Sequence, residues 1–128
     1  AKDPVNQTGM VAHNVATGEL ILTGPDVLTE DMPVLDVRTP GEYAGGHMPN
    51  SLNIPHTQLR DRLDEVRAWV DENAHEQPFV VMCAAGVRSW IGYRIVRAAG
   101  FDVTMLSGGI QTLRAWLGDR AATVLVKE

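Results

Sequence analysis

Cysteine is almost absent from this sequence, which has a single one, Cys83, among 128 residues. One cysteine cannot close an internal disulfide, so we expect a protein of the reducing cytoplasm rather than of an oxidising compartment. A chain of this length can bury a sufficient core without disulfide support. The sequence therefore predicts one domain whose stability comes from packing.

Long apolar runs and clusters of basic residues are also missing. No stretch reaches the roughly 18 apolar residues that a membrane-spanning helix needs, and no signal peptide is recognisable. The 16 acidic residues outnumber the 11 basic ones, which gives a net charge of −5. We therefore expect neither nucleic acid nor a membrane as a partner, because both attract a concentrated positive surface. The chain begins AKDPVN rather than with methionine, which suggests either a piece of a longer polypeptide or a trimmed chain.

Metal and nucleotide motifs are absent as well. The histidines have no metal-ligand spacing, and a lone cysteine does not complete a site; they are His13, His47, His56 and His75. No Gly-x-Gly-x-x-Gly pattern occurs, so this chain should bind neither FAD nor NAD(P)H. We expect no metal and no cofactor in this chain.

Short apolar stretches do alternate with amphipathic segments. The apolar stretches predict strands at residues 19–23, 32–37, 51–54, 79–82 and 101–106. The amphipathic segments predict helices at residues 57–72, from the end of the Cys83 loop to residue 99, and at 110–117, with single turns at 26–29 and 41–47. This alternation predicts an α/β fold with a mostly parallel central sheet and helices on both faces.

Each predicted helix has an apolar stripe that we expect to face the sheet. The stripes are Leu59, Leu63, Val66, Trp69 and Val70 in the first helix, Ile91, Ile95, Val96 and Ala99 in the second, and Leu113, Trp116 and Leu117 in the third. Gly92 lies within the second helix, where glycine costs about 1 kcal/mol relative to alanine. Close packing of that helix against the sheet would explain its presence.

The stretch FVVMCAAGVRSWIG, residues 79–92, places Cys83 where a strand ends and a helix begins. In open α/β sheets, ligands bind beyond the carboxyl ends of the strands. The backbone N–H groups of residues 84–88 can form a nest around the sulfur, and Gly86 can adopt the positive φ that a tight loop needs. This setting favours a nucleophilic thiolate. The alternative is an inert cysteine buried in the core.

Three segments together resemble the rhodanese-like sulfurtransferase domains. They are DVRTPGEYAGGHMPNSLNIP at residues 36–55, CAAGVRS at 83–89 and GFDVTMLSGGIQTLRAW at 100–116, in the family's order and spacing. The resemblance covers about three quarters of the chain and implies a rhodanese-like fold. We expect an arm at residues 1–24, the rhodanese-like domain at 25–118 and a tail at 119–128. There are two departures from the family pattern: Asn50 stands where the family usually has glycine, and Ala84 and Ala85 leave the loop unusually plain.

The resemblance also assigns roles to residues. It implies catalytic roles for Cys83 and Arg88, substrate contacts from Ala84, Ala85, Gly86, Val87 and Ser89, and support from Asp36, Arg38, Glu42 and His47. Purely structural roles are the alternative for several of these residues. Arg88 could form an ordinary salt bridge, Ser89 could cap the helix, and His47 could bind a backbone group in a turn. Asp36 and Arg38 are expected to form an ion pair, and Trp90 could form the rim of the loop.

The first twenty residues, AKDPVNQTGMVAHNVATGEL, are similar to the segment that joins coenzyme A disulfide reductases to their C-terminal rhodanese domain. These reductases are FAD-dependent pyridine nucleotide-disulfide oxidoreductases. The similarity implies a flavin disulfide reductase domain in the same polypeptide as a partner. FAD, and coenzyme A with it, would then belong to the parent protein.

Three functions remain open at this point. Sulfur transfer through a Cys83 persulfide is the first, with a small sulfur donor and a thiol acceptor as partners. Because residues 84–87 are uncharged, we expect a polysulfide or a low-molecular-weight persulfide to be preferred over thiosulfate. The second is a cysteine-based phosphatase, but the related phosphatases have five residues between cysteine and arginine, and here there are four. The third is a non-catalytic interaction or regulatory module.

Overall fold

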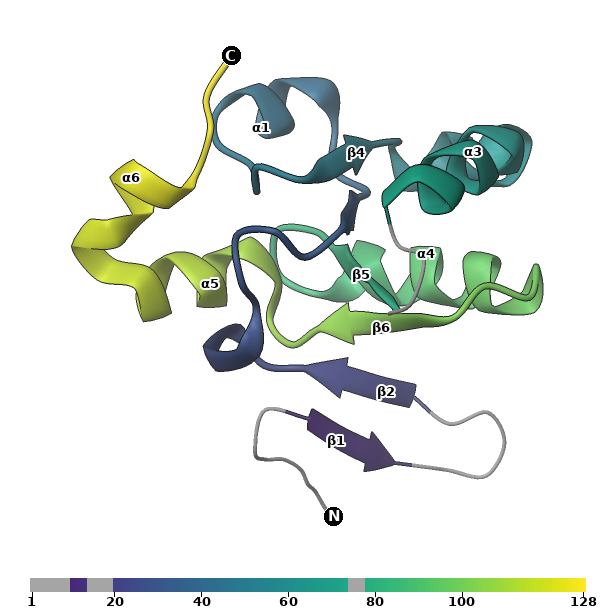
Figure 1. The fold of residues 1–128 in the computed structure, drawn as a ribbon, viewed down its shortest axis with the longest axis horizontal. Helices are drawn as coiled ribbons and strands as arrows, with labels where there is room; N and C mark the ends of the chain where they lie inside the picture. Colours follow the sequence, from purple (N-terminus) through teal and green to yellow (C-terminus); the bar gives the residue numbers. More distant parts are fainter. Residues whose placement is uncertain (1–9, 14–19, 74–77) are drawn as a thin grey trace.

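A six-stranded sheet forms the centre of the computed structural model, which describes residues 10–13, 20–73 and 78–128 (Figure 1). The strands are β1 (Met10–His13), β2 (Leu20–Thr23), β3 (Val34–Asp36), β4 (Ser51–Asn53), β5 (Phe79–Met82) and β6 (Val103–Leu106). Their order across the sheet is β1-β2-β6-β5-β3-β4. β1 pairs with β2 in an antiparallel manner, and every other pairing is parallel. The expectation of a mostly parallel α/β sheet is therefore confirmed.

Helices cover both faces of this sheet. One face carries α2 (His56–Leu59), α3 (Leu63–Asn73) and α4 (Val87–Ala98), and the other carries α5 (Gly109–Leu117) and α6 (Ala121–Val124). The short α1 (Pro40–Ala44) follows β3, and single 3₁₀ turns lie at η1 (Pro25–Val27), η2 (Arg60–Arg62) and η3 (Gly118–Arg120). The predicted helix at 57–72 is thus interrupted by η2.

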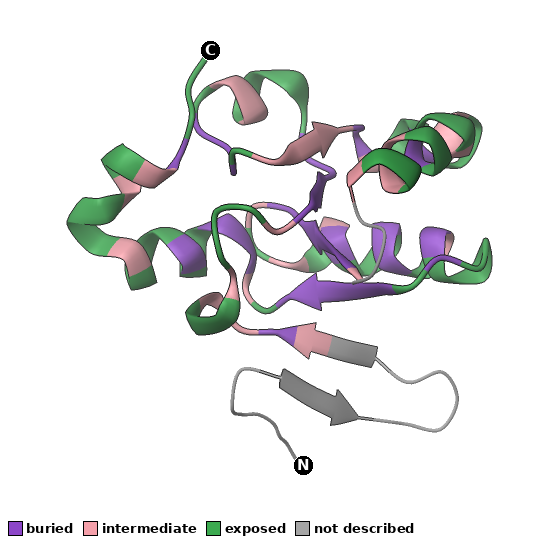
Figure 2. Ribbon diagram, viewed as in Figure 1, coloured by how far each residue is buried: buried purple, intermediate pink, exposed green. Residues whose placement is uncertain are grey.

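The central strands are buried on both sides. All residues of β3, β5 and β6 are buried, and successive side chains belong to opposite cores: Leu35 and Val81 to one, Val34 and Val80 to the other. Continuous apolar runs of this kind are typical of parallel strands that have helices on both faces. Figure 2 shows these strands in purple, with the outer surfaces of the helices in green.

Two segments outside the predicted domain limits join this architecture. β2 pairs with β6, and the backbone groups of Val126 exchange hydrogen bonds with those of His47. Leu125 is buried in the core beneath α5. The limits at residues 24 and 118 stay predictions, and much of the expected arm, residues 1–9 and 14–19, lies outside the described residues.

Two of the expected apolar stripes are wrong in part. Ile91 and Trp116 are 40% and 52% exposed instead of packed in the core, and Ala99 is exposed too. The face that α4 buries consists of Ser89, Gly92, Tyr93 and Val96. Neighbouring residues of a helix point about 100° apart, so a helix that turns Gly92 toward the sheet turns Ile91 away from it.

Gly92 sets the distance of α4 from the sheet. A Cβ atom at this position would lie 3.1 Å from Cγ1 of Val37 and 3.4 Å from Cγ1 of Val81. The expectation that Gly92 permits close helix-to-sheet packing is therefore confirmed. Because α4 starts at the Cys83 loop, this contact also fixes the position of the loop.

We expect Gly92→Leu to lower the free energy of unfolding by about 1 to 3 kcal/mol, since a bulky side chain would overpack this contact. Gly41→Ala is the control, because a Cβ at Gly41 would meet nothing within 4 Å. Urea unfolding followed by circular dichroism measures both. An unfolding midpoint for Gly92→Leu at or above that of the wild type would contradict the role given to Gly92.

Candidate functional site

Cys83 is the first residue after β5, and α4 begins four residues later at Val87. The residue is only 1% exposed, and its Sγ accepts a hydrogen bond from the backbone N–H of Gly86 at 3.0 Å. Gly86 has φ 117°, which confirms the expected left-handed conformation, and it occupies the N-cap position of α4. A donor fixed by the backbone stabilises negative charge on the sulfur without having to move.

The carbonyl side of the loop is held by the start of α5. Ile110 N–H donates to the carbonyl oxygen of Cys83 at 2.7 Å, and Gln111 N–H donates to that of Ala84 at 3.0 Å. Gly109, at φ 67°, makes this approach possible, because a Cβ there would lie 2.5 Å from the Cys83 oxygen. The sequence pattern does not single out Gly109 as a site residue; its only signal is the Gly-Gly pair at 108–109.

Arg88 is paired with Glu42 of α1. Its Nη1 and Nη2 donate to the two carboxylate oxygens of Glu42 at 2.7 and 3.0 Å. These hydrogen bonds are the main reason that the pKa of Glu42 is lowered to about 2. The pKa of Arg88 is raised, first by the same hydrogen bonds and further by the negative charge of Glu42. The only cation of the loop is therefore already neutralised by a carboxylate.

Glu42 is itself held in place by Thr39, the N-cap residue of α1. Its side chain accepts hydrogen bonds from the backbone N–H and the hydroxyl of Thr39, and Thr39 Oγ1 accepts from the Glu42 N–H. This reciprocal capping box closes the N-terminus of the helix. One carboxylate thus caps α1 and binds the guanidinium of the Cys83 loop.

Asp36 and Arg38 form the expected ion pair, and both are almost fully buried. Arg38 Nη2 lies 2.7 Å from Oδ2 of Asp36, and Nε lies 2.9 Å from Oδ1. The remaining donors of Arg38 reach the carbonyl oxygens of Glu42 and Gly46 at 3.2 and 2.8 Å. The pair supports the turn around α1 and makes no hydrogen bond to the Cys83 loop among the described residues.

His47 is buried in the same turn. Its Nδ1 lies 2.9 Å from the carbonyl oxygen of Met48, its Nε2 lies 3.0 Å from a carboxylate oxygen of Glu128, and its ring stacks on Tyr43 at 3.7 Å. Both ring nitrogens are therefore engaged away from Cys83. This arrangement agrees with a histidine that holds a turn.

Ser89 lies in the first turn of α4 and is fully buried. It is not the helix cap, since Gly86 occupies that position, and its Oγ has no hydrogen-bond partner among the described residues. The other residues of the loop are more exposed to solvent. Ala85 is exposed, Ala84 and Gly86 are half-buried, and Val87 is 73% exposed.

The structure thus brings Cys83, Gly86, Arg88 and Glu42 together. It places Asp36, Arg38 and His47 in and around the turn of α1, away from the sulfur. Within the described part of the chain, no group of three His, Cys, Asp or Glu side chains could hold a metal ion. None of the described helices combines the length and apolar character that crossing a bilayer needs.

Proteins of more than one kind are similar to this chain in sequence. A tRNA 2-selenouridine synthase of Azotobacter vinelandii is 30% identical over 125 residues, which cover 74% of this chain and 34% of that protein. A sulfurtransferase of Allochromatium vinosum is 31% identical over 83 residues, 64% of this chain and 71% of that protein. The chain therefore spans about a third of the length of the selenouridine synthase.

Two solved structures share the fold. Bacillus anthracis CoADR-RHD has 29% identity and a TM-score of 0.59, and the match covers 73% of this chain and 15% of that one. A NAD-dependent persulfide reductase from A. fulgidus has 33% identity and a TM-score of 0.56, covering 71% of this chain and 15% of that one. The family model described as the rhodanese-like domain matches residues 22–115, which include β5, the Cys83 loop and α4. The chain belongs to the rhodanese-like domain family.

Proposed function

We propose that this domain transfers sulfur and carries it as a persulfide on Cys83. The observation that carries the proposal is the Gly86 N–H directed at the Cys83 sulfur from the start of α4. A thiol in this position faces a backbone donor and the positive end of the helix, both of which favour a thiolate and then a persulfide anion. Membership of the family and the sulfurtransferase relative support the same reaction.

The reaction is two successive displacements at sulfur. The Cys83 thiolate attacks the outer sulfur of the donor, a new S–S bond forms, and the donor's own S–S bond breaks. The donor leaves as a thiolate, or as sulfite if the donor is thiosulfate, and takes the bonding electron pair. A thiolate acceptor then attacks the outer sulfur of the Cys83 persulfide, and the Cys83 thiolate leaves. No net oxidation occurs, so no further reactant is needed.

The loop residues stabilise charge during these steps. In this proposal the backbone N–H groups of residues 84–88 would bind the outer sulfur, as Gly86 N–H already binds Sγ of Cys83, and Arg88 would add a guanidinium. Such preformed donors act as an oxyanion hole does, here for sulfur. Four residues between Cys83 and Arg88 make a loop suited to one sulfur atom rather than to a tetrahedral phosphate.

The preferred donor in this proposal is a polysulfide or the persulfide of a small thiol. Glu42 neutralises Arg88, and Asp36 neutralises the buried Arg38, so neither cation is free to bind a dianion such as thiosulfate. Ala84 and Ala85 add no charge. A persulfide carries its transferable sulfur at one end, and the rest of the molecule can bind outside the loop.

The proposed setting is a larger pyridine nucleotide-disulfide oxidoreductase. Support comes from CoADR-RHD and the persulfide reductase, of which the matching region is only a small part. In that setting, the flavin disulfide reductase domain is the partner of this domain. FAD, with coenzyme A as the carrier thiol, would belong to the rest of the polypeptide, and we propose no cofactor for this domain.

We expect Cys83→Ser to abolish persulfide formation and turnover, because a hydroxyl group cannot form the S–S bond. Intact-mass spectrometry after incubation with a polysulfide should show a gain of one sulfur atom in the wild type and none in the variant. Ser107→Ala, at an exposed turn residue, is the control and should load normally. Sulfur transfer by the serine variant would show that Cys83 is not the carrier.

We expect no appreciable hydrolysis of aryl phosphates, since the loop is one residue shorter than a phosphate requires. Insertion of one glycine after Val87 should weaken sulfur transfer, because it displaces Arg88 and the rest of α4 relative to the sulfur. Para-nitrophenyl phosphate hydrolysis and persulfide turnover measure the two effects. Robust phosphatase activity of the unmodified chain would contradict the pocket size inferred here.

We expect kcat/KM for a small-thiol persulfide to exceed that for thiosulfate, and Ala84→Lys or Glu42→Gln to narrow the gap. A charge-assisted hydrogen bond is worth roughly 1.5 to 3 kcal/mol, so either change should raise thiosulfate efficiency by about tenfold. Glu65→Gln, which removes the carboxylate of the exposed Arg62 pair, is the matched control. Steady-state kinetics with both donors decide the question, and a wild-type preference for thiosulfate would refute the expected donor.

A further inference from the structure

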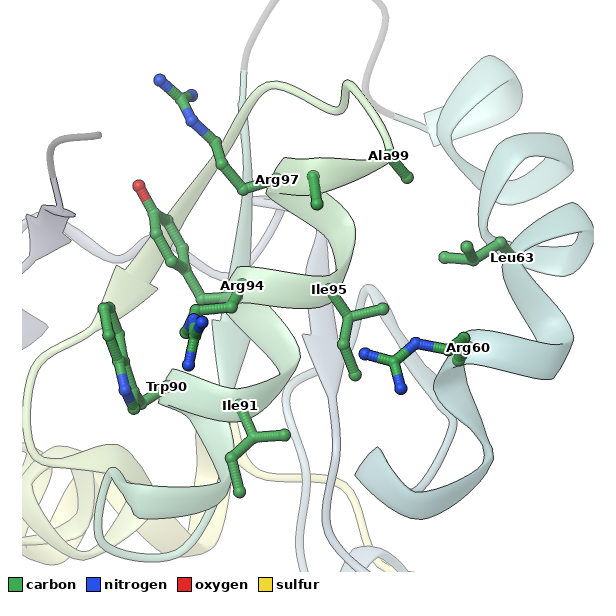
Figure 3. Close-up of a pocket in the computed structure, with 10 residues that line it drawn as sticks. Arg60, Leu63, Trp90, Ile91, Arg94, Ile95, Arg97 and Ala99 are labelled. Carbon is green, nitrogen blue, oxygen red and sulfur yellow. The ribbon is translucent and has the colours of Figure 1, made fainter. Parts of the chain in front are cut away.

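A groove of about 700 Å³ lies between α4 and the segment that contains η2 and the start of α3 (Figure 3). Ile91 and Ile95 of α4 face Arg60 and Leu63, and Trp90, Arg94 and Arg97 line the other side of α4. The proposed sulfur chemistry uses none of these residues.

The charge of the groove is opposite to that of the whole chain. Arg60, Arg94 and Arg97 line it, and no lining residue is acidic, although the chain has a net charge of −5. Three arginines outside the groove are paired, Arg38 with Asp36, Arg62 with Glu65 and Arg88 with Glu42. The groove arginines form no ion pair with any described carboxylate. Cations that are left unpaired in an acidic protein form a local site for an acidic partner.

The groove also exposes large apolar side chains. Trp90 is 43% exposed and Ile91 is 40% exposed. The indole of Trp90 stacks on Tyr93, with ring centroids 6.1 Å apart, and the guanidinium of Arg94 lies 5.7 Å from its centroid. Tryptophan and arginine are the residues that most often dominate the binding energy of protein interfaces.

The groove begins next to the Cys83 loop. Trp90 follows Gly86 by one turn of α4, a rise of about 6 Å along the helix. Val87, which is 73% exposed, continues the apolar surface from Trp90 to the loop itself. The end of the groove that contains Trp90 therefore lies one helical turn from the Cys83 loop.

We propose that this groove docks an acidic protein segment with large apolar side chains, part of a protein whose thiol exchanges sulfur with Cys83. The guanidinium groups of Arg60, Arg94 and Arg97 point in different directions rather than toward one point (Figure 3). Such a spread suits several carboxylates along a peptide better than one compact anion. An amphipathic segment in a groove between helices is a common mode of recognition. The sulfur exchange rests on the proposed function of Cys83, whereas the docking does not.

Binding is tested on the full chain carrying Cys83→Ser, which prevents sulfur transfer. The probe is a short fluorescein-labelled peptide with glutamate and leucine at helical spacing, and the control peptide has lysine in place of glutamate. We expect the acidic peptide to bind and to shift the amide NMR signals of α4 and residues 60–63. The double variant Arg60→Glu/Arg94→Glu should weaken binding by about tenfold or more, since reversed charges repel the partner. Arg120→Glu/Lys127→Glu makes the same change in net charge at exposed residues away from the groove and should leave binding intact.

Several outcomes would overturn the docking proposal. They are no binding of the acidic peptide, equal binding of the lysine peptide, signal shifts confined to other surfaces, or binding unaffected by Arg60→Glu/Arg94→Glu. Binding of a single-stranded oligouridylate in the groove in place of the acidic peptide would also overturn it, in favour of a nucleic acid partner.

A second measurement separates this inference from the proposed function. With Cys83 restored and loaded with sulfur, Arg60→Glu/Arg94→Glu should transfer sulfur to dithiothreitol at the wild-type rate. It should lose about tenfold in kcat/KM toward an acidic peptide that contains a cysteine. If the wild type transfers sulfur to neither acceptor, the proposed function fails, while peptide binding still decides whether the groove is a docking site.

Discussion

The backbone hydrogen bonds around the Cys83 loop are the constraint on which the site depends. Gly86 N–H meets the sulfur from one side, and the first turn of α5 holds the carbonyl groups of Cys83 and Ala84 from the other. In both contacts the donor is a backbone N–H group, which no side-chain rotation can remove. The loop is therefore shaped before any substrate arrives, which is the condition for electrostatic stabilisation without reorganisation.

A second line of support reaches the loop through side chains. The buried pair of Asp36 and Arg38 holds the turn around α1, α1 presents Glu42, and Glu42 binds Arg88. Removing one partner of a buried pair costs roughly 3 to 5 kcal/mol, because the other charge is left uncompensated. The exposed pair of Glu42 and Arg88 is worth much less to stability. The effect of this pair is electrostatic, because the charge of Glu42 cancels that of Arg88 at the exposed side of the Cys83 loop.

Much of the fold could be predicted from local pattern, and the failures have physical causes. The runs around Leu35 and Val81 are continuous and apolar, so they indicate buried parallel strands without further information. The orientation of α4 could not be read from its apolar residues, because the small Gly92, not Ile91, decides which side approaches the sheet. The pairing of Arg88 with Glu42 joins residues 46 apart in the sequence, and the roles of Gly109 and β1 likewise depend on contacts that only the folded chain creates.

The contacts made by the C-terminal part of the chain can form only after the Cys83 loop has been synthesised. Ile110 and Gln111, which hold the Cys83 carbonyl side, and residues 126–128, which close the turn behind α1, are made after the loop itself. Contacts between residues so distant in sequence require closing a long loop, which slows folding. When Cys83 leaves the ribosome, the residues that hold its loop and the turn behind α1 have therefore not yet emerged. The Gly86 contact is local in sequence, whereas the bonds that hold the carbonyl groups of Cys83 and Ala84 can form only when α5 has folded against the loop.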